Sequence, residues 1–375
     1  GIRGEPGRPE VPADGLVWSA IQNHLDDRRY QDSYVTVAEL DRSTLSSHPW
    51  SLTGGGASDV SSLITASRSL LGQGVLSIGR TTVVGEDDAW FTSESRARAI
   101  GLGESVREIV VGENVRDFRV ADQALIWWPF EDVLKPEWVE SSHPVPARIL
   151  WPVRTPLSRR VIFGQTLTER DRPWYDHLES YASKMRTPLS ITFAFVATHN
   201  HFVLDRGGKV FKQSAPVIKL AAGASEDDHL RLLGVLNSST ACFWLRQNSH
   251  DKGRPGAEAG GADEPWERRF EFTGTTLQDF PLPKSLPLER ARTLDGLAQE
   301  LSAQQVGTVI DSETPTAGLL AESEAAQASL RGQMVAQQEE LDWEVYPSYG
   351  LLDEALAFAG EPPEIGPGER AFAIV

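Results

Sequence analysis

The chain has 375 residues, 40% of them hydrophobic, and carries a net charge of -17 with a single cysteine. This length is enough for about two or three domains, and the hydrophobic content is enough for a core, so a wholly disordered protein is excluded. Cys242 lies in the apolar stretch ACFWL and has no partner for a disulfide or a cysteine metal site. This favours a reducing compartment and a role in the core.

The sequence contains no signal for membrane insertion or export. No stretch approaches about 18 uninterrupted apolar residues, and the opening segment GIRGEPGRPEVP lacks the apolar region and cleavage site of a signal peptide. We therefore expect a cytoplasmic protein with no membrane partner. The chain opens without Met on a Pro- and Gly-rich segment typical of a linker, and we expect it to be the downstream part of a longer polypeptide.

The first part of the chain predicts short elements of both kinds. Apolar spacing indicates a helix over 16–25, and YVTVAEL at 34–40 indicates a short strand. After a proline and a triple glycine, a second helix is expected over 59–71. Between 75 and 130, strand-like pieces alternate with Gly- and Asp-containing turns, which is typical of a β-rich unit.

The second part predicts a mixed central region and a helical end. We expect, in order, a helix over 169–185, strands over 190–204 and 209–220 joined by the tight turn Asp-Arg-Gly-Gly at 205–208, a helical segment over 226–247 broken at Asn-Ser-Ser, a low-complexity loop over 250–265, a strand over 266–274 and acidic helices from 288 onward.

Charge is segregated along the sequence. Residues 148–219 hold 12 Lys/Arg against 5 Asp/Glu, a local balance of +7, whereas residues 301–375 hold 2 basic against 13 acidic residues, a balance of -11. A cationic centre in an acidic chain is expected of an anion-binding surface carried on an acidic support. The alternative is that helices and strands solvate different faces.

The cationic centre also holds polar side chains suited to nucleic acid. Arg and Asn match base edges in the major groove, and Lys and Thr suit phosphates. The alternative is a strand end with satisfied polar groups. Asn237, Ser238 and Ser239 precede an apolar helix, where they either cap the helix or hold a phosphate at its N-terminus.

Metal and catalytic interpretations are weaker. His199 and His201 with Asp205 nearby make two thirds of a metal site, but neighbouring basic side chains repel a cation. The acidic run at 86–88 suits either Mg²⁺ or a solvated turn. The chain contains no GxSxG, HExxH, CxxC, PD-(D/E)xK, P-loop or Asn/Asp-Pro-Pro-Tyr/Phe pattern, so we expect no catalytic residues and no metal site.

Longer motifs carry a resemblance to a known family. They are HPWSL with GGGA (48–57), GEDD (85–88), VRDF (115–118), FGQTLTERDRPWY (163–175), RTPLSITFAFVATHNHFVLDRGGKVFKQSAPVIKL (186–220), LLGVLNSSTACFWL (232–245), HDKG (250–253), FEFTGTTLQDFPLP (270–283) and QEELDWEVY with YGLLD near the end. Together they resemble the C-terminal half of the PglX-like adenine-specific DNA methyltransferases of BREX and phage growth limitation defence systems.

The resemblance implies that DNA recognition and methyl transfer belong to different parts of the complete enzyme. In that family the S-adenosylmethionine pocket and the Asn-Pro-Pro-Tyr tetrad lie upstream of the matching segment, and this chain contains neither. It implies that the chain uses no cofactor itself and is not catalytic alone. S-adenosylmethionine serves the complete enzyme, through a methylase domain fused upstream or supplied in trans. The implied partners are duplex DNA, that methylase domain and other BREX-type defence proteins.

We therefore predict an α+β protein with a mixed β-rich DNA-recognition domain, helical insertions and a helical C-terminal region. The predicted divisions are a linker with a connecting helix and strand (1–49), a target-recognition domain (50–285) and a helical region (286–375). The predicted DNA-binding residues are Arg116, Arg186, Thr198, His199, Asn200, His201, Arg206, Lys209, Lys212, Asn237, Ser238, Ser239 and Lys252. The alternatives are a non-catalytic protein-interaction subunit, and a metal-dependent nuclease using Glu86, Asp87 and Asp88 with His199 and His201.

Overall fold

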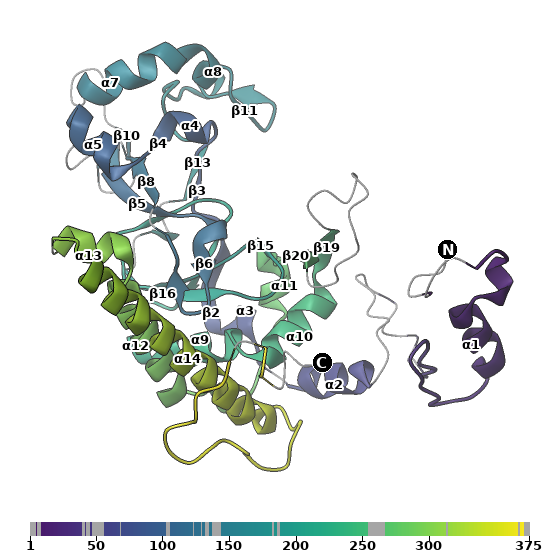
Figure 1. The fold of residues 1–375 in the computed structure, drawn as a ribbon. Coiled ribbons are helices and arrows are strands. Elements are labelled where there is room, and N and C mark those ends of the chain that lie inside the picture. The colour runs from purple at the N-terminus through teal and green to yellow at the C-terminus, as the bar shows by residue number, and fades with distance from the viewer. Residues whose placement is uncertain are drawn as a thin grey trace.

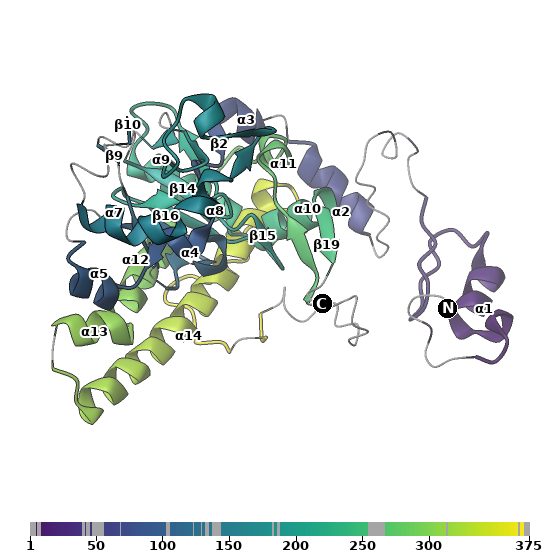
Figure 2. The ribbon, with the colours of Figure 1, turned by 90° about the horizontal axis from the view of Figure 1, so that it is seen from above.

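The computed structural model describes residues 5, 9–39, 42, 46, 56–67, 69–102, 106–122, 124–128, 130–131, 135–136, 144–181, 184–185, 188–253, 267–312, 314–366 and 368–370. The predicted α+β class is confirmed, because helices and small sheets alternate through most of the chain and helices dominate its end. None of the helices in these ranges is long and apolar enough to cross a lipid bilayer. In both views α1 lies apart from the other labelled elements (Figures 1 and 2).

The helices differ greatly in length, and the longest is the last. The α-helices are α1 (Leu16–His24), α2 (Ala57–Thr65), α3 (Leu71–Gly74), α4 (Asp87–Trp90), α5 (Glu94–Ile100), α7 (Pro144–Leu150), α8 (Arg154–Ser158), α9 (Glu226–Leu236), α10 (Ser239–Asn248), α11 (Gly274–Gln278), α12 (Glu289–Ala303), α13 (Val306–Ser312) and α14 (Ala317–Ser348). Short 3-10 turns are η1 (Pro12–Asp14), η4 (Gly112–Asn114), η5 (Trp151–Val153) and η6 (Thr168–Arg170).

The strands form several small sheets. The two four-stranded sheets have the orders β16 (Phe202–Asp205), β14 (Ser190–Phe193), β18 (Val217–Leu220), β2 (Val75–Gly79), and β17 (Val210–Phe211), β5 (Val106–Val110), β8 (Ala124–Trp127), β4 (Phe91–Thr92). A third sheet has the order β15 (Val196–Ala197), β20 (Arg269–Glu271), β19 (His250–Gly253). Pairs of strands are β1 (Ser69–Leu70) with β21 (Pro281–Leu282), β3 (Thr82–Val83) with β13 (Glu179–Ser180), β6 (Val115–Arg116) with β7 (Arg119–Val120), β9 (Phe130–Glu131) with β10 (Lys135–Pro136), and β11 (Val161–Ile162) with β12 (Gln165–Thr166).

The sheet containing β14 lies at the centre of the lower lobe in Figure 1. Every residue of β14 and β16 is buried, as expected for strands covered on both faces. α9 packs against both strands, and the β6–β7 hairpin packs against β16. One hydrophobic core joins these strands to α9, α10, α12 and α14 through residues such as Phe193, Leu233, Leu294 and Leu341.

The upper lobe in Figure 1 has a separate core. Trp90, Ile126, Trp127 and Leu157 belong to it, and they come from α4, β8 and α8. The strand β17 links the lobes, because it pairs in parallel with β5 of this sheet directly after the chain leaves β16. The predicted turn at 205–208 therefore does not close a hairpin between neighbouring strands, and that prediction was wrong.

The C-terminal region is helical, as predicted. α12 and α14 pack side by side, and both belong to the core that contains the central sheet (Figure 2). The predicted boundary at 286 thus falls between elements that share one core. The break between α9 and α10 is also confirmed, since Ser225 and Ser238 cap these two helices with their side-chain oxygens.

Several predicted elements differ from the structure. The helix expected over 59–71 ends at Thr65, the strand expected over 209–220 is two strands, β17 and β18, in different sheets, and the loop expected over 250–265 begins with β19. In the segment expected as a strand over 34–40, the described residues 34–39 take part in an isolated bridge, between Gln31 and Thr36, and in no strand. The segment 169–185 is not a helix, because Pro173 has no N–H and nearby carbonyls accept hydrogen bonds from the Arg160 side chain. The segment 190–204 is not one strand, because the chain reverses and β14 pairs antiparallel with β16.

Candidate functional site

The turn between β15 and β16 brings together most of the predicted polar residues. Thr198, His199 and Asn200 line a hollow of about 360 Å³, hereafter the His–Asp hollow. The other lining residues come from three distant segments and are Asp117, Asn237, Ser238, Ser239, Cys242, Arg246 and Arg370. Because these segments lie far apart in the sequence, tertiary packing alone assembles the hollow.

Reciprocal amide bonds fix this turn to the break between α9 and α10. Asn200 donates its Nδ2 to the carbonyls of Leu236 (2.6 Å) and Ser238 (3.3 Å). Asn237 accepts from the backbone N–H of Phe202 and donates to its carbonyl, both at 2.9 Å. A buried amide paired in this way satisfies backbone groups that would otherwise lack partners.

The helix α14 supports the same break from the other side. Gln338 donates to the Asn237 carbonyl at 2.8 Å, and the backbone N–H of Ser239 donates to Asp342 at 2.7 Å. The Ser239 hydroxyl lies 2.9 Å from that of Tyr346. The sequence offered two roles for Asn237 and Ser238, helix capping and phosphate binding, and the hydrogen bonds support capping. Asn200 and Ser239, which are also buried, help to join the turn to the break between α9 and α10.

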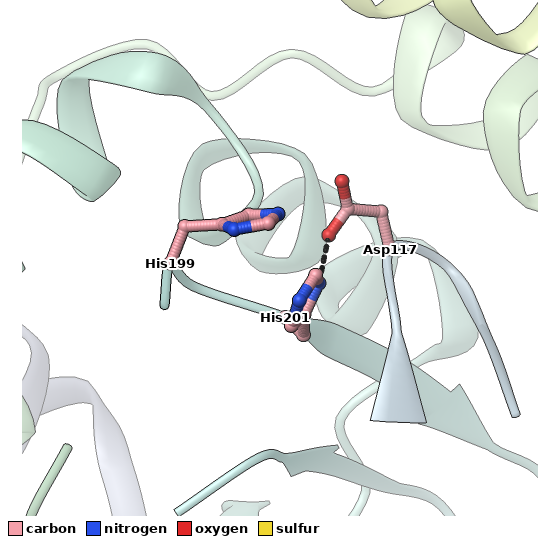
Figure 3. Close-up of side chains that lie close together, drawn as sticks. All are labelled: Asp117, His199 and His201. Carbon is pink, nitrogen blue, oxygen red and sulfur yellow. Dashed lines mark hydrogen bonds and ion pairs between the residues drawn. The ribbon is translucent and has the colours of Figure 1, made fainter. Parts of the chain in front are cut away.

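A histidine–aspartate pair lies at one edge of the hollow (Figure 3). Asp117, in the turn between β6 and β7, accepts a 2.6 Å hydrogen bond at Oδ1 from Nδ1 of His201. Burial has the largest single effect on the pKa of Asp117 and raises it, but the hydrogen bond from His201 and the charges of His201, His199 and Arg370 together outweigh burial and hold that pKa below its ordinary value. Asp117 is therefore an ionised carboxylate that orients the His201 ring.

His199 lies next to this pair, with ring centroids of His199 and His201 4.1 Å apart. The predicted proximity of the two histidines thus holds, although they project from a turn and not from one strand. The side chain is open to solvent at one edge, and desolvation in the hollow lowers the pKa of His199 to about 4, with a further contribution from His201. His199 is therefore neutral at pH 7 and offers one donor and one acceptor.

Asp117, His199 and His201 also have the composition of a metal site, and their ligand atoms all lie within 4.8 Å of one another. The sequence suggested Asp205 as the carboxylate of this group, but in the structure that carboxylate comes from Asp117. Asp205 instead accepts a hydrogen bond from the backbone N–H of Gly207. Two features oppose a cation. The Asp117 carboxylate is already engaged by His201, and the positive charges of Arg116, Arg246 and Arg370 act on this group.

We therefore expect no saturable heat when Zn²⁺ is titrated into the chain at pH 7.5 in a calorimeter. Bound metal would release protons and stabilise the folded state by an amount that grows with the logarithm of its affinity, so a tight site would be evident. Saturable binding that is lost in both His199→Ala and Asp117→Asn would overturn this expectation.

Four cations of the predicted DNA-binding set are ion-paired, namely Arg206, Lys209, Lys212 and Lys252. Arg206 binds Glu226 and Asp295, both at 2.6 Å. Lys209 lies 3.4 Å from Asp205 and 3.8 Å from Glu108. Lys212 pairs with Asp87, and Lys252 pairs with Glu271 at 2.7 Å. Each of these cations is neutralised by a nearby carboxylate, so it would have to exchange that carboxylate for a phosphate in order to bind DNA.

These residues do not form one surface with the His–Asp hollow. Arg206 and Lys209 line a separate groove of about 410 Å³ that also contains Arg119 and Asp295. Arg116 lies beside the hollow on β6, exposed, with its guanidinium donating to the carbonyls of Glu113 and Val115. Arg186 lies outside the described residues.

Sequence reasoning missed Asp117, Arg246 and Arg370 as members of the site. Asp117 is separated from His201 by 84 positions, and no spacing rule connects them. The interpretation of Cys242 as a core residue agrees with the structure, because it is buried and burial raises the pKa of its thiol to about 11. The thiol therefore stays protonated and unreactive at neutral pH.

Comparison with known proteins confirms the resemblance found in the sequence. The chain is 42% identical over 388 residues to the adenine-specific methyltransferase PglX of Streptomyces coelicolor, a match that covers 100% of this chain and 32% of that protein. The chain thus spans about a third of the length of this relative. No protein-family profile matches it.

Two solved structures are similar at a lower level. The type IIL restriction-modification enzyme MmeI in complex with DNA superposes with a TM-score of 0.42 and 11% identity, over 76% of this chain and 34% of that one. The type IIG restriction endonuclease BpuSI superposes with a TM-score of 0.40 and 12% identity, over 80% and 34% of the two chains.

Proposed function

We propose that this chain is the target-recognition portion of a PglX-like, adenine-specific DNA methyltransferase of a phage-defence system, and that it binds and positions duplex DNA. The observation that carries the proposal is the similarity to PglX along the whole chain. Because the chain spans about a third of that relative, we assign methyl transfer to a methylase domain outside it. S-adenosylmethionine would supply the methyl group there, to an adenine flipped from the duplex.

The rim of the His–Asp hollow offers the donors that such a role needs. Exposed Arg246 lines the hollow together with Thr198 and His199, and exposed Arg116 lies next in sequence to Asp117, which also lines it. Arginine suits phosphates and guanine edges. Nδ1 of His199 lies 2.9 Å from the Thr198 hydroxyl, so Nε2 is the ring nitrogen proposed to contact a base. At this rim we keep Arg116, Thr198 and His199 as proposed DNA contacts, with Arg186 from the sequence, and add Arg246. Lys209 and Lys212, away from the hollow, stay proposed phosphate contacts.

The proposal is tested by fluorescence anisotropy of labelled duplex DNA with the full chain over a series of salt concentrations. Phosphate contacts release counterions, so the logarithm of the binding constant should fall linearly with the logarithm of salt concentration. Affinity that does not change from low to moderate salt would contradict DNA binding. Stable capture of another defence protein without any DNA shift would favour the interaction-subunit alternative.

The double variant Lys209→Ala, Lys212→Ala is expected to weaken binding about equally for all DNA sequences. The loss of two free phosphate contacts would lower the slope of log binding constant against log salt concentration by about two. Because each lysine must first give up a carboxylate partner, we expect a reduction of about one. Lys284→Ala, at an exposed position in the loop between β21 and α12, is the control and should leave the slope unchanged. A change confined to one DNA sequence would instead indicate base contacts by these lysines.

A further inference from the structure

The β11–β12 hairpin presents an aromatic side chain to solvent at its tip. Val161 pairs with Thr166 and Ile162 with Gln165, so Phe163 and Gly164 form the two-residue turn. The Phe163 side chain is 76% exposed, and Val161 beside it is 55% exposed. Figure 1 shows this hairpin at the outer edge of the upper lobe, next to α8.

The backbone of this turn is unfavourable for phenylalanine. Phe163 has φ of 50° and Gly164 has φ of 80°, so both central residues adopt the left-handed conformation. Such turns favour Asn-Gly, because a bulky residue with positive φ brings its Cβ close to backbone atoms. A strained, exposed aromatic residue is poorly explained by folding and is common where a side chain serves binding.

The hairpin grows from a rigid base. Arg160 and Leu167 flank the two strands directly, and both are buried. Arg160 is held by five hydrogen bonds to backbone carbonyls, and Glu169 accepts from the Thr166 backbone N–H at 2.7 Å. The tip is therefore held in place while its aromatic ring remains accessible.

The surroundings of the tip are rich in arginine. Residues 144–172 contain six arginines and two acidic residues, in a chain whose net charge is -17. Arg154, Arg159 and Arg170 are exposed, and within the described part of the chain none of the three is paired with a carboxylate. This distinguishes them from the ion-paired cations Arg206, Lys209, Lys212 and Lys252.

Aromatic rings and arginines alternate on this surface. The Arg170 guanidinium lies 5.7 Å from the centroid of the Phe163 ring. Arg154 lies 4.8 Å from the ring of Trp151, which is 55% exposed, and 5.9 Å from that of Trp174. An exposed ring flanked by unpaired cations matches a base stack flanked by phosphates, because the ring can stack on a base while the guanidinium groups neutralise the backbone.

We propose that the β11–β12 hairpin is a DNA wedge: Phe163 inserts at a base step of duplex DNA, and Arg154, Arg159 and Arg170 hold the adjacent phosphates. The wedge rests on the proposed DNA-binding function and adds a contact surface on the upper lobe, apart from the His–Asp hollow. Unstacking of a base step lowers the cost of extruding a target base, so the wedge would assist the flipping that adenine methylation requires.

The decisive variant is Phe163→Asn. Asn-Gly is the preferred sequence for this turn, so the thermal midpoint should rise or stay the same while affinity for duplex DNA falls about tenfold, the loss expected for one aromatic stacking contact. A folding defect would instead lower both quantities together. Phe163→Trp keeps a ring and should retain affinity. Phe358→Ala, which removes a 53% exposed phenylalanine from the segment that follows α14, is the control.

Insertion of Phe163 between bases can be measured separately from affinity, by the fluorescence of a base analogue in the DNA. Short duplexes carrying 2-aminopurine at successive positions should show increased fluorescence at one or more positions with the wild-type chain, because the probe brightens when it is unstacked, and the increase should be lost with Phe163→Asn. If the wild-type chain binds DNA but Phe163→Asn binds equally well with the same fluorescence, the wedge is refuted and the proposed function stands. If the wild-type chain does not bind duplex DNA, both are refuted.

Discussion

Replacing Arg160 with methionine is expected to lower the free energy of unfolding by about 3–5 kcal/mol, whereas the same change at Arg159 should cost less than about 0.5 kcal/mol. The two arginines are adjacent in the sequence, and only Arg160 is buried. Methionine has a similar length and no donors. The difference between the two variants therefore measures the hydrogen bonds of the Arg160 guanidinium.

Those hydrogen bonds join three segments of the upper lobe. The five N–H groups of Arg160 donate to the carbonyls of Leu157, Val84, Gly85, Trp174 and Asp176 at 2.7–3.2 Å. Burial lowers the pKa of Arg160 to about 10, so the guanidinium still carries its charge at neutral pH. Without it, buried carbonyls lose their partners, and each loss costs more than the bond contributes.

Chemical denaturation followed by tryptophan fluorescence measures both variants. Equal stability of Arg160→Met and Arg159→Met would contradict the assignment of Arg160 as a structural centre. DNA binding should show the opposite order, because Arg159 is exposed beside the β11–β12 hairpin. A loss of affinity in Arg159→Met with unchanged stability would separate the two roles.

The free energy of unfolding is expected to fall by about 3 kcal/mol through His177 alone as the pH is lowered from 7 to 4. His177 is fully buried, and its ring lies 4.6 Å from that of Trp90 and 5.1 Å from that of Trp128. Desolvation, with smaller effects of Arg160 and Arg172, lowers its pKa to about 3. The folded state therefore holds a neutral ring, while the unfolded chain takes up a proton below about pH 6.5.

The free energy of unfolding falls at low pH because the unfolded chain then binds one more proton at His177 than the folded chain does. A depressed pKa in the folded state gives stability that is complete above the unfolded pKa and is lost as the pH falls. His199 acts in the same direction, since its pKa is also lowered, but its exposure makes the effect smaller. Asp342 acts in the opposite direction, because burial raises its pKa to about 6 and favours the folded state at the acid end.

Urea denaturation at a series of pH values measures the slope. His177→Gln should flatten most of the decline between pH 7 and pH 4, and His199→Gln should flatten a smaller part of it. Asp342→Asn should make the decline steeper. A wild-type slope that His177→Gln leaves unchanged would show that this buried ring does not titrate between the folded and unfolded states as proposed.

The parts of the fold that were predicted correctly have local causes. The helix at 16–24 and the acidic helices after 288 follow from apolar spacing along the chain. The break at 237–238 follows from the hydroxyl cap that Ser238 supplies to α10. Each signal lies within a few residues of the element that it specifies. The resemblance to PglX rests on longer strings of residues and was equally readable in the sequence.

The errors came from places where distant atoms override local preference. The segment 169–185 has helical composition, but its carbonyls at Trp174 and Asp176 bind Arg160 and not helical N–H groups. The strand expected over 190–204 reverses, and Asn200 and Asn237 supply the hydrogen bonds that join the reversed chain to the helix break. A single residue can decide such a segment, and its partner is not visible in the local sequence.

Four features could be read from the amino-acid sequence: a mixed α and β fold, a helical end, a cationic centre and a family resemblance. Tertiary structure decided which of the cations and histidines are available for binding. Asp295 lies 89 positions from Arg206, and Asp87 lies 125 positions from Lys212, yet each closes an ion pair. A charge count over a stretch of sequence includes only residues that are close along the chain. Electrostatic interactions depend on the distance between charges in space, and folding sets that distance.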